Sequence, residues 1–145
     1  MILIYLVGAF GYGGLEMLWR GHTHWTMLVL GGMCFSLLYL IVTRMREPIW
    51  KRWLVCASVI TTLEFLCGCI VNLRLGWDVW DYSGVPGNLM GQICPEFFLL
   101  WLLLSVPCSG LALAMRKYLF RFSPAPSIQH AETEIPGGTG SAGNS

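Results

Sequence analysis

The stretch WLVCASVITTLEFLCGCIVNL at residues 53–73 decides the fold, because it is long and apolar and carries a single charged residue, Glu64. In helical form, about 20 such residues cross the roughly 30 Å hydrocarbon core of a bilayer. Comparable runs lie at 2–19, 25–43 and 88–115, and none of them holds more than one charged residue. The sequence therefore predicts an all-α membrane protein with four transmembrane helices.

The composition agrees with a membrane location. Charged residues make up 12% of the 145 residues and hydrophobic residues 55%, whereas an ordinary soluble domain carries about 25% charged residues. The six cysteines all fall inside the apolar runs, and a secreted disulfide framework would instead place them in hydrophilic loops. We interpret them as small buried apolar residues.

The fourth run is longer than one membrane crossing requires and contains Pro95 and Pro107. Either one helix covers 88–115 and tilts or kinks, or the helix begins near Pro95, because proline is tolerated in the first helical turn. In the second case residues 88–94 have irregular backbone, which within a membrane has to be buried in protein or line a cavity. The sequence leaves both arrangements open.

Basic residues flank the four runs unequally. Seven follow the second or fourth run, and one lies in each of the other two connections: Arg44, Arg46, Lys51, Arg52, Arg116, Lys117 and Arg121 against Arg20 and Arg74. The positive-inside rule then places both termini and the second connection in the cytoplasm. We predict two helical hairpins with both ends inside. Residues 123–145 have too little apolar surface to fold alone, so we predict a disordered cytoplasmic tail there.

Three carboxylates each lie alone in an apolar run, namely Glu16, Glu64 and Glu96. A carboxylate is costly in hydrocarbon, so it normally faces a protein interior, a water-filled cavity or a partner. Each of the three also belongs to a set of residues spaced by four, which share one helix face. These sets are Tyr12, Glu16 and Arg20; Glu64, Gly68 and Asn72; and Asn88, Gln92 and Glu96.

The polar faces predict a ligand or ion pocket in the outer half of the bundle. Its candidate residues are Glu16, Glu64, Asn72, Asn88, Gln92 and Glu96. The other interpretation is that these side chains hold the helices together, with the carboxyl groups protonated or paired to Arg20 and Arg74.

The two predicted outer connections carry distinctive side chains. Asp78 and Asp81 can pair with Arg20 or Arg74, and together with Tyr82 they would close the outer face as a lid; interfacial anchoring of the aromatic residues is the alternative. His22 and His24 are weak metal-ligand candidates, because a metal site usually needs three or four ligands. We therefore predict no metal site and no cofactor.

Motifs in these connections resemble a bacterial family described as type IV ABC-transporter permeases. The first motif is RGHTHW at 20–25 followed by GGMCF at 31–35, and the second is WDYS at 80–83 with Pro86, Asn88 and GQIC at 91–94. The similarity extends from Gly11 to Trp101. It implies a small multi-pass protein of the bacterial inner membrane and, less directly, a role in transport.

The chain lacks the G-x-x-x-x-G-K-[ST] phosphate loop, so ATP-driven transport would need a separate cytoplasmic ATPase subunit. The connection 44–52 can dock such a subunit, or it is a basic turn that only sets topology.

No catalytic constellation is evident, so we predict no enzyme activity. We expect a permease-like transporter component that forms homo- or hetero-oligomers and binds no nucleic acid. The alternative is a non-transporting scaffold or regulatory subunit that binds another membrane protein through small-residue faces.

Overall fold

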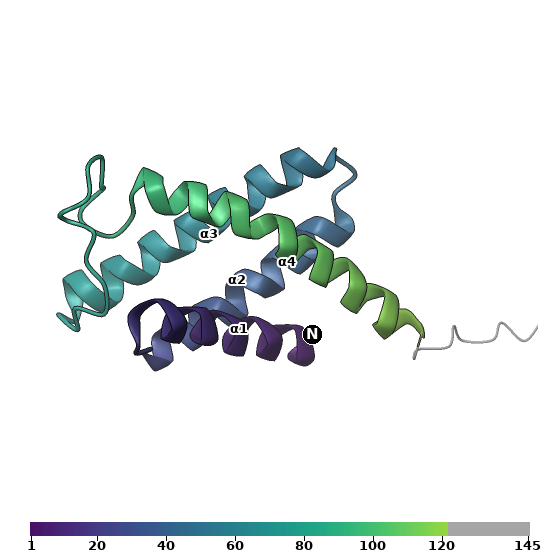
Figure 1. Ribbon diagram of the computed structural model, residues 1–145, viewed down its shortest axis with the longest axis horizontal. Coiled ribbons are helices and arrows are strands. Elements are labelled where there is room, and N and C mark those ends of the chain that lie inside the picture. The colour runs from purple at the N-terminus through teal and green to yellow at the C-terminus, as the bar shows by residue number, and fades with distance from the viewer. Residues whose placement is uncertain (122–145) are drawn as a thin grey trace, which may run out of the picture.

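The computed structural model describes residues 1–121, and within them the chain is helical apart from its connections. The elements are α1 (Ile2–Arg20), α2 (Trp25–Arg44), α3 (Ile49–Gly68), the π-helical turn η1 (Cys69–Arg74) that continues α3, and α4 (Pro95–Arg121) (Figure 1). Four helices in this part of the chain are long and apolar enough to cross a membrane, which confirms the predicted fold class. The predicted tail at 123–145 lies outside the described residues.

Local sequence signals explain where the first two helices meet. α1 ends because Gly21 adopts a left-handed conformation with φ 72°, and its N–H donates to the Met17 carbonyl. Glycine takes this conformation without the steric cost that a Cβ imposes. α2 then begins after His24, whose ring nitrogen accepts a hydrogen bond from the Thr26 N–H. The short 21–24 connection is thereby fixed at both ends.

The fourth helix begins at Pro95, so the second of the two arrangements that the sequence left open is the one adopted. Proline has no amide hydrogen to contribute and fits the first turn, whereas a helix from 88 would have to carry it inside. Residues 88–94 instead form irregular backbone in which Leu89 and Ile93 pair as an isolated bridge. The expected span of 88–115 and the expected polar face joining Asn88, Gln92 and Glu96 on one helix are therefore wrong.

The helices alternate in direction, so their connections gather at two ends of the molecule. The 21–24 connection and residues 75–94, which we call the capping loop, lie at one end (left in Figure 1), and the 45–48 connection lies at the other. The pairing of the helices into two hairpins and their orientation across the membrane stay predictions.

α2 is the central helix, because it packs against α1, α3 and α4, whereas α1 packs closely along α2 alone. Glycines bring α1 and α2 together. A Cβ added to Gly8 would lie 2.4 Å from the Phe35 Cβ, and one added to Gly31 would lie 2.3 Å from the Tyr12 Cβ. Small residues permit this close approach of transmembrane backbones.

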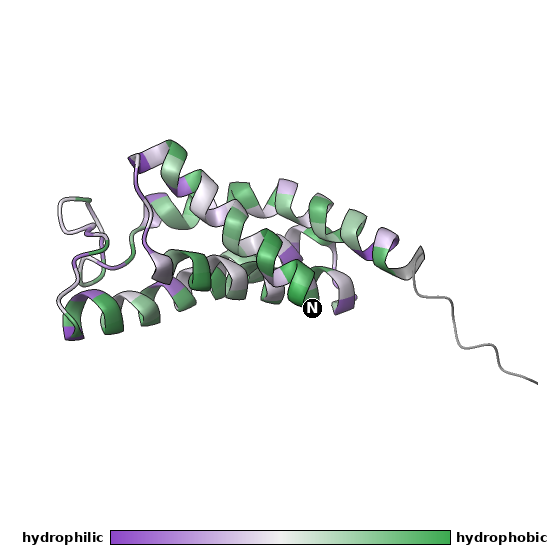
Figure 2. Cartoon of the chain, turned by 90° about the horizontal axis from the view of Figure 1, so that it is seen from below, coloured by the Kyte–Doolittle hydropathy of each residue, from purple (hydrophilic) through white to green (hydrophobic). Residues whose placement is uncertain are grey.

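Large apolar side chains are exposed on all four helices, and hydrophobic residues predominate along the helices in Figure 2. Phe10 is 70% exposed, Leu18 87% and Leu103 70%. In a water-soluble protein such contiguous apolar surface would mark an interface, whereas lipid solvates it. This surface is what four helices of a membrane protein require.

Candidate functional site

Glu64 of α3 is the most enclosed carboxylate in the described residues, with 1% of its surface exposed. The indole N–H of Trp101 in α4 donates to one carboxylate oxygen at 2.7 Å. The hydroxyl of Tyr82 in the capping loop donates to the other at 3.2 Å. Two donors from separate elements therefore compensate the desolvation of this carboxylate, and Glu64 joins α3, α4 and the capping loop.

Aromatic rings surround this contact. Tyr12 of α1 stacks on Trp101 with ring centroids 5.8 Å apart, and Tyr82 stacks on Phe97 with centroids 4.4 Å apart. Burial, followed by the nearby Glu64 carboxylate, raises the pKa of Tyr82 above its ordinary value. The Tyr82 phenol therefore stays protonated and able to donate its hydrogen bond.

Glu16 forms a second polar contact at the same end of the bundle and is 7% exposed. Its carboxylate pairs with the Arg20 guanidinium at 3.1 Å and accepts a hydrogen bond of 2.6 Å from the Thr23 hydroxyl. Arg20 also donates to the Val79 carbonyl of the capping loop. The predicted polar face of α1 is thus used to hold the 21–24 connection and the capping loop.

Glu96 lies apart from these two carboxylates. It is exposed in the first turn of α4, where a negative charge is favourable because it faces the positive end of the helix dipole. The structure therefore places Glu16 and Glu64 inside the bundle and leaves Glu96 on its surface.

Asn72, in the π-helical turn, attaches the capping loop to α3. Its amide donates to the Trp80 carbonyl at 2.9 Å and to the Gln92 side-chain oxygen at 2.8 Å, and its own oxygen accepts from the Val79 N–H at 2.8 Å. The Trp80 indole N–H also donates to the Gln92 carbonyl at 3.1 Å. π-helical turns are uncommon and frequently occur at functional sites; here the turn presents Asn72 to the loop.

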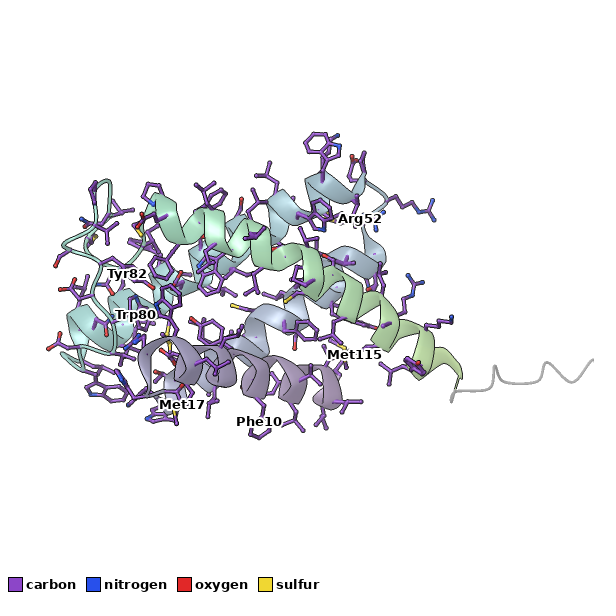
Figure 3. All side chains as sticks on the ribbon, viewed as in Figure 1. Phe10, Met17, Arg52, Trp80, Tyr82 and Met115 are labelled. Carbon is purple, nitrogen blue, oxygen red and sulfur yellow. The ribbon has the colours of Figure 1, made fainter. Side chains whose placement is uncertain are left out.

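The capping loop is also held by contacts within itself. Asn88 donates to the Ser83 and Val85 carbonyls and accepts from the Gly91 N–H, at 2.8–3.1 Å. Asn72, Asn88 and Gln92, which the sequence suggested as pocket residues, therefore have structural contacts of their own. Trp80 and Tyr82 point from this loop toward the helices (Figure 3).

The predicted ion pairs of the lid are not formed. Arg20 pairs with Glu16 instead, and among the side chains that the structure describes neither Asp78 nor Asp81 pairs with Arg20 or Arg74. The backbone and hydroxyl of Ser83 donate to Asp81 instead, and these hydrogen bonds lower its pKa. The loop covers the helix ends, but hydrogen bonds such as those of Arg20 to Val79, Tyr82 to Glu64 and Asn72 to Trp80 hold it there in place of the predicted ion pairs.

The two histidines also have local contacts. His22 lies 3.3 Å from the Arg20 guanidinium, and His24 caps α2. No three potential metal ligands come together in the part of the chain that the structure describes.

A cavity of about 190 Å³ lies between α1 and α4 beneath the capping loop. The lining residues that carry polar atoms in their side chains are Tyr12, Glu16, Trp19, Arg20, Tyr82 and Trp101. Glu64 does not line this cavity, but both of its hydrogen-bond donors do. A molecule in the cavity would therefore contact the two side chains that hold the buried carboxylate.

Sequence reasoning missed Trp101 and Phe97, which lie in an uninterrupted apolar run of α4. One signal for Trp101 was available, because a buried indole N–H normally finds an acceptor. Nothing in the sequence says that this acceptor is Glu64, which lies 37 positions earlier.

Comparison with known families assigns the chain. The family model described as "Putative ABC-transporter type IV" matches residues 6–130, which include the capping loop, both buried carboxylates and their partners. Neither the curated proteins nor the solved structures give a match. The match confirms the resemblance carried by the two connection motifs, and with four apolar helices it identifies a multi-pass membrane protein related to transport. The chain belongs to the type IV ABC-transporter family that this model describes.

Proposed function

We propose that the chain is the permease-like membrane component of a transporter, and that its substrate binds in the cavity beneath the capping loop. The observation that carries this proposal is the arrangement around Glu64. Tyr82 and Trp101 donate to the enclosed carboxylate and also line the cavity. Intramembrane carboxylates that face a bundle interior commonly belong to substrate or ion pathways.

This arrangement couples occupancy of the cavity to the capping loop. A substrate that displaces the Tyr82 ring removes one hydrogen bond from Glu64 and weakens the stacking on Phe97. The loop then has less to hold it against α3, so occupancy shifts the population toward an open loop. Loop motion of this kind commonly gates access to a site.

The proposal includes a separate cytoplasmic ATPase subunit, an oligomeric assembly and a location in the bacterial inner membrane. The sequence contains no phosphate loop, so this chain does not supply ATP hydrolysis in the P-loop manner. Arg52 donates to the Val42 and Glu47 carbonyls at 2.9 and 2.7 Å, which stiffens the 45–48 connection. A stiff connection is suited to receiving force from a partner.

A second candidate is a non-transporting scaffold that binds another membrane protein. Its support is the outer face of α1, where a Cβ added to Gly14 would meet no atom within 4 Å and Phe10 is 70% exposed. Such a face offers room for close helix contact.

Transport is tested in membrane vesicles from cells that carry the wild-type chain, Glu64→Gln or Glu96→Gln. The solutes accumulated or lost with and without ATP are compared by mass spectrometry. Glu96 is the matched control because its carboxylate is exposed in the first turn of α4 and does not line the cavity.

We expect wild type and Glu96→Gln to show the same ATP-dependent solute change. Glu64→Gln should lose it by about tenfold or more, because replacing a charged hydrogen-bond acceptor by a neutral one removes roughly 1.4 kcal/mol. An absence of any ATP-dependent solute change in wild-type vesicles contradicts the transporter. If Gly14→Leu then releases a co-purifying membrane protein, the scaffold is the better account.

A further inference from the structure

A second cavity continues the first one along the cleft between α1 and α4. It has a volume of about 260 Å³ and shares Tyr12, Leu15, Trp101 and Leu104 with the first. Away from these shared residues its lining is almost wholly apolar. The cleft exists because α1 packs closely along α2 alone and because Gly11 has no side chain to fill the space beside it.

The opposite end of the cleft is acidic and aromatic. A third cavity, under the capping loop, shares Trp19, Arg20, Tyr82 and Phe97 with the first and adds Asp78 and Asp81. The Arg20 charge is already paired with Glu16, so the two aspartates provide the remaining charge in the lining of this cavity. Hydrogen bonds from Ser83 hold the pKa of Asp81 low, which keeps that carboxylate ionised.

We propose that this cleft binds an amphiphile with one alkyl tail and a cationic head group. The tail lies between α1 and α4, and the head lies beneath the capping loop near Asp78 and Asp81. This inference rests on the proposed function and gives the substrate class of the same site.

The size of the apolar cavity fits one tail. Its volume of about 260 Å³ is slightly below the roughly 300 Å³ at which ordinary small-molecule pockets begin. A single alkyl chain fills such a space, and each buried methylene contributes about 0.8 kcal/mol of transfer free energy when it leaves water. A two-tailed lipid would leave its second tail outside the cleft.

The head-group end favours a cation for two reasons. Asp78 and Asp81 attract positive charge and repel an anionic head, and the faces of Trp19 and Phe97 can receive an ammonium group by cation–π interaction. A transmembrane helix from a neighbouring protein is a poorer occupant, because its apolar side chains would supply no positive charge opposite these carboxylates.

The depth of the two ends also matches an amphiphile that arrives from the bilayer. Arg20 and the capping loop lie at the helix ends, where lipid head groups are found, whereas Gly11 and Leu104 lie inside the membrane-crossing helices. The molecule can therefore move sideways into the cleft without carrying its head group across the hydrocarbon core.

The test uses the full chain in phosphatidylcholine vesicles and a dodecylammonium probe with a diazirine near the end of its tail. After illumination, mass spectrometry locates the labelled residues. We expect labels on the cleft faces of α1 and α4. Unlabelled dodecyltrimethylammonium should compete with the probe, and dodecyl sulfate should not.

Gly11→Phe and Gly14→Phe provide a matched pair on one helix. A Cβ at either position meets no atom within 4 Å, but Gly11 lines the apolar cavity and Gly14 lines none of the three. Gly11→Phe should reduce cleft labelling about tenfold, the loss expected when roughly two methylenes are excluded. Gly14→Phe should leave it unchanged. In the double variant Asp78→Asn, Asp81→Asn, the probe should still label the cleft. Dodecyltrimethylammonium should then compete with the probe no better than dodecyl sulfate does.

Several results would overturn the inference. Equal labelling of Gly11→Phe and wild type would show that the tail lies elsewhere. Equal competition by dodecyl sulfate and dodecyltrimethylammonium would show that the site does not prefer a cationic head group. Labels on the outer faces of the helices in place of the cleft would identify ordinary contact with the bilayer instead. Binding is measured here without ATP, so a negative result combined with Glu64-dependent solute transport would reject the ligand class and leave the transporter standing.

Discussion

The hydroxyl of Tyr82 donates a 3.2 Å hydrogen bond to the Glu64 carboxylate, 18 positions earlier in the chain. Tyr82 belongs to the capping loop, and Glu64 lies inside the third transmembrane helix. The same carboxylate receives the indole N–H of Trp101 at 2.7 Å. The position of the loop and the packing of α3 on α4 therefore depend on one buried acceptor, and this dependence can be measured.

Removing that acceptor should destabilise the bundle. Glu64→Ala leaves the Trp101 N–H and the Tyr82 hydroxyl without their partner, at roughly 1–3 kcal/mol for each buried donor. We expect the free energy of unfolding, measured by denaturant titration in detergent micelles, to fall by about 3 kcal/mol. Glu64→Gln keeps an acceptor oxygen and should lose less. Equal losses in both variants would show that the hydrogen bonds contribute little.

Docking of the capping loop should weaken in alkali. The pKa of Tyr82 is raised above the ordinary value of 10.0, so the docked state favours the protonated phenol. The stabilisation is then complete below pH 10.0 and is lost as the pH rises above it. We expect protease cleavage within 75–94 to accelerate above this pH in the wild type. Tyr82→Phe should start from a less protected loop and show no comparable rise.

Loss of the Asn72 side chain should free the capping loop while the helices stay folded. Asn72→Ala removes three hydrogen bonds to the loop, each contributing about 1 kcal/mol. Hydrogen exchange of the Val79 N–H should accelerate by about two orders of magnitude, and amides in the middle of α2 should not change. Slow exchange at Val79 in this variant would mean that Arg20 and Tyr82 suffice to hold the loop.

The contact between α1 and α2 should tolerate no side chain at Gly8. An added Cβ would lie 2.4 Å from the Phe35 Cβ and 2.6 Å from the Gly31 carbonyl oxygen, so the helices must separate. Overpacking of this kind costs about 1–3 kcal/mol, and we expect Gly8→Ala to lower the free energy of unfolding by that amount. Gly14→Ala is the control. It adds a methyl group in open space and should be neutral or stabilise the helix by up to about 1 kcal/mol.

The sequence predicts the helices well, because hydrocarbon imposes a length and a composition on each crossing. It also marks Glu16 and Glu64 as interior side chains, because a carboxylate in an apolar run is costly when it faces lipid. The same reasoning does not apply to Glu96. That residue follows Pro95, which starts the helix, so it occupies an exposed first turn rather than the bundle interior.

The capping loop could not be predicted at the same level. Asn72 meets Trp80 and Gln92 from the π-helical turn that continues α3, and no local pattern in the sequence predicts such a turn. The loop is likewise held by side chain to backbone hydrogen bonds, which any polar residue of suitable reach can supply. Charge complementarity alone suggested the wrong partners for Asp78 and Asp81.

The glycine-mediated contact of α1 with α2 has a consequence for how the protein is made. Both helices are complete at Arg44, so the ribosome has synthesised their whole interface before α3 emerges. The other side of the cleft beside α1 forms later, when α4 places Trp101 against Tyr12. We therefore expect this face of α1 to be open to lipid acyl chains until α4 is inserted.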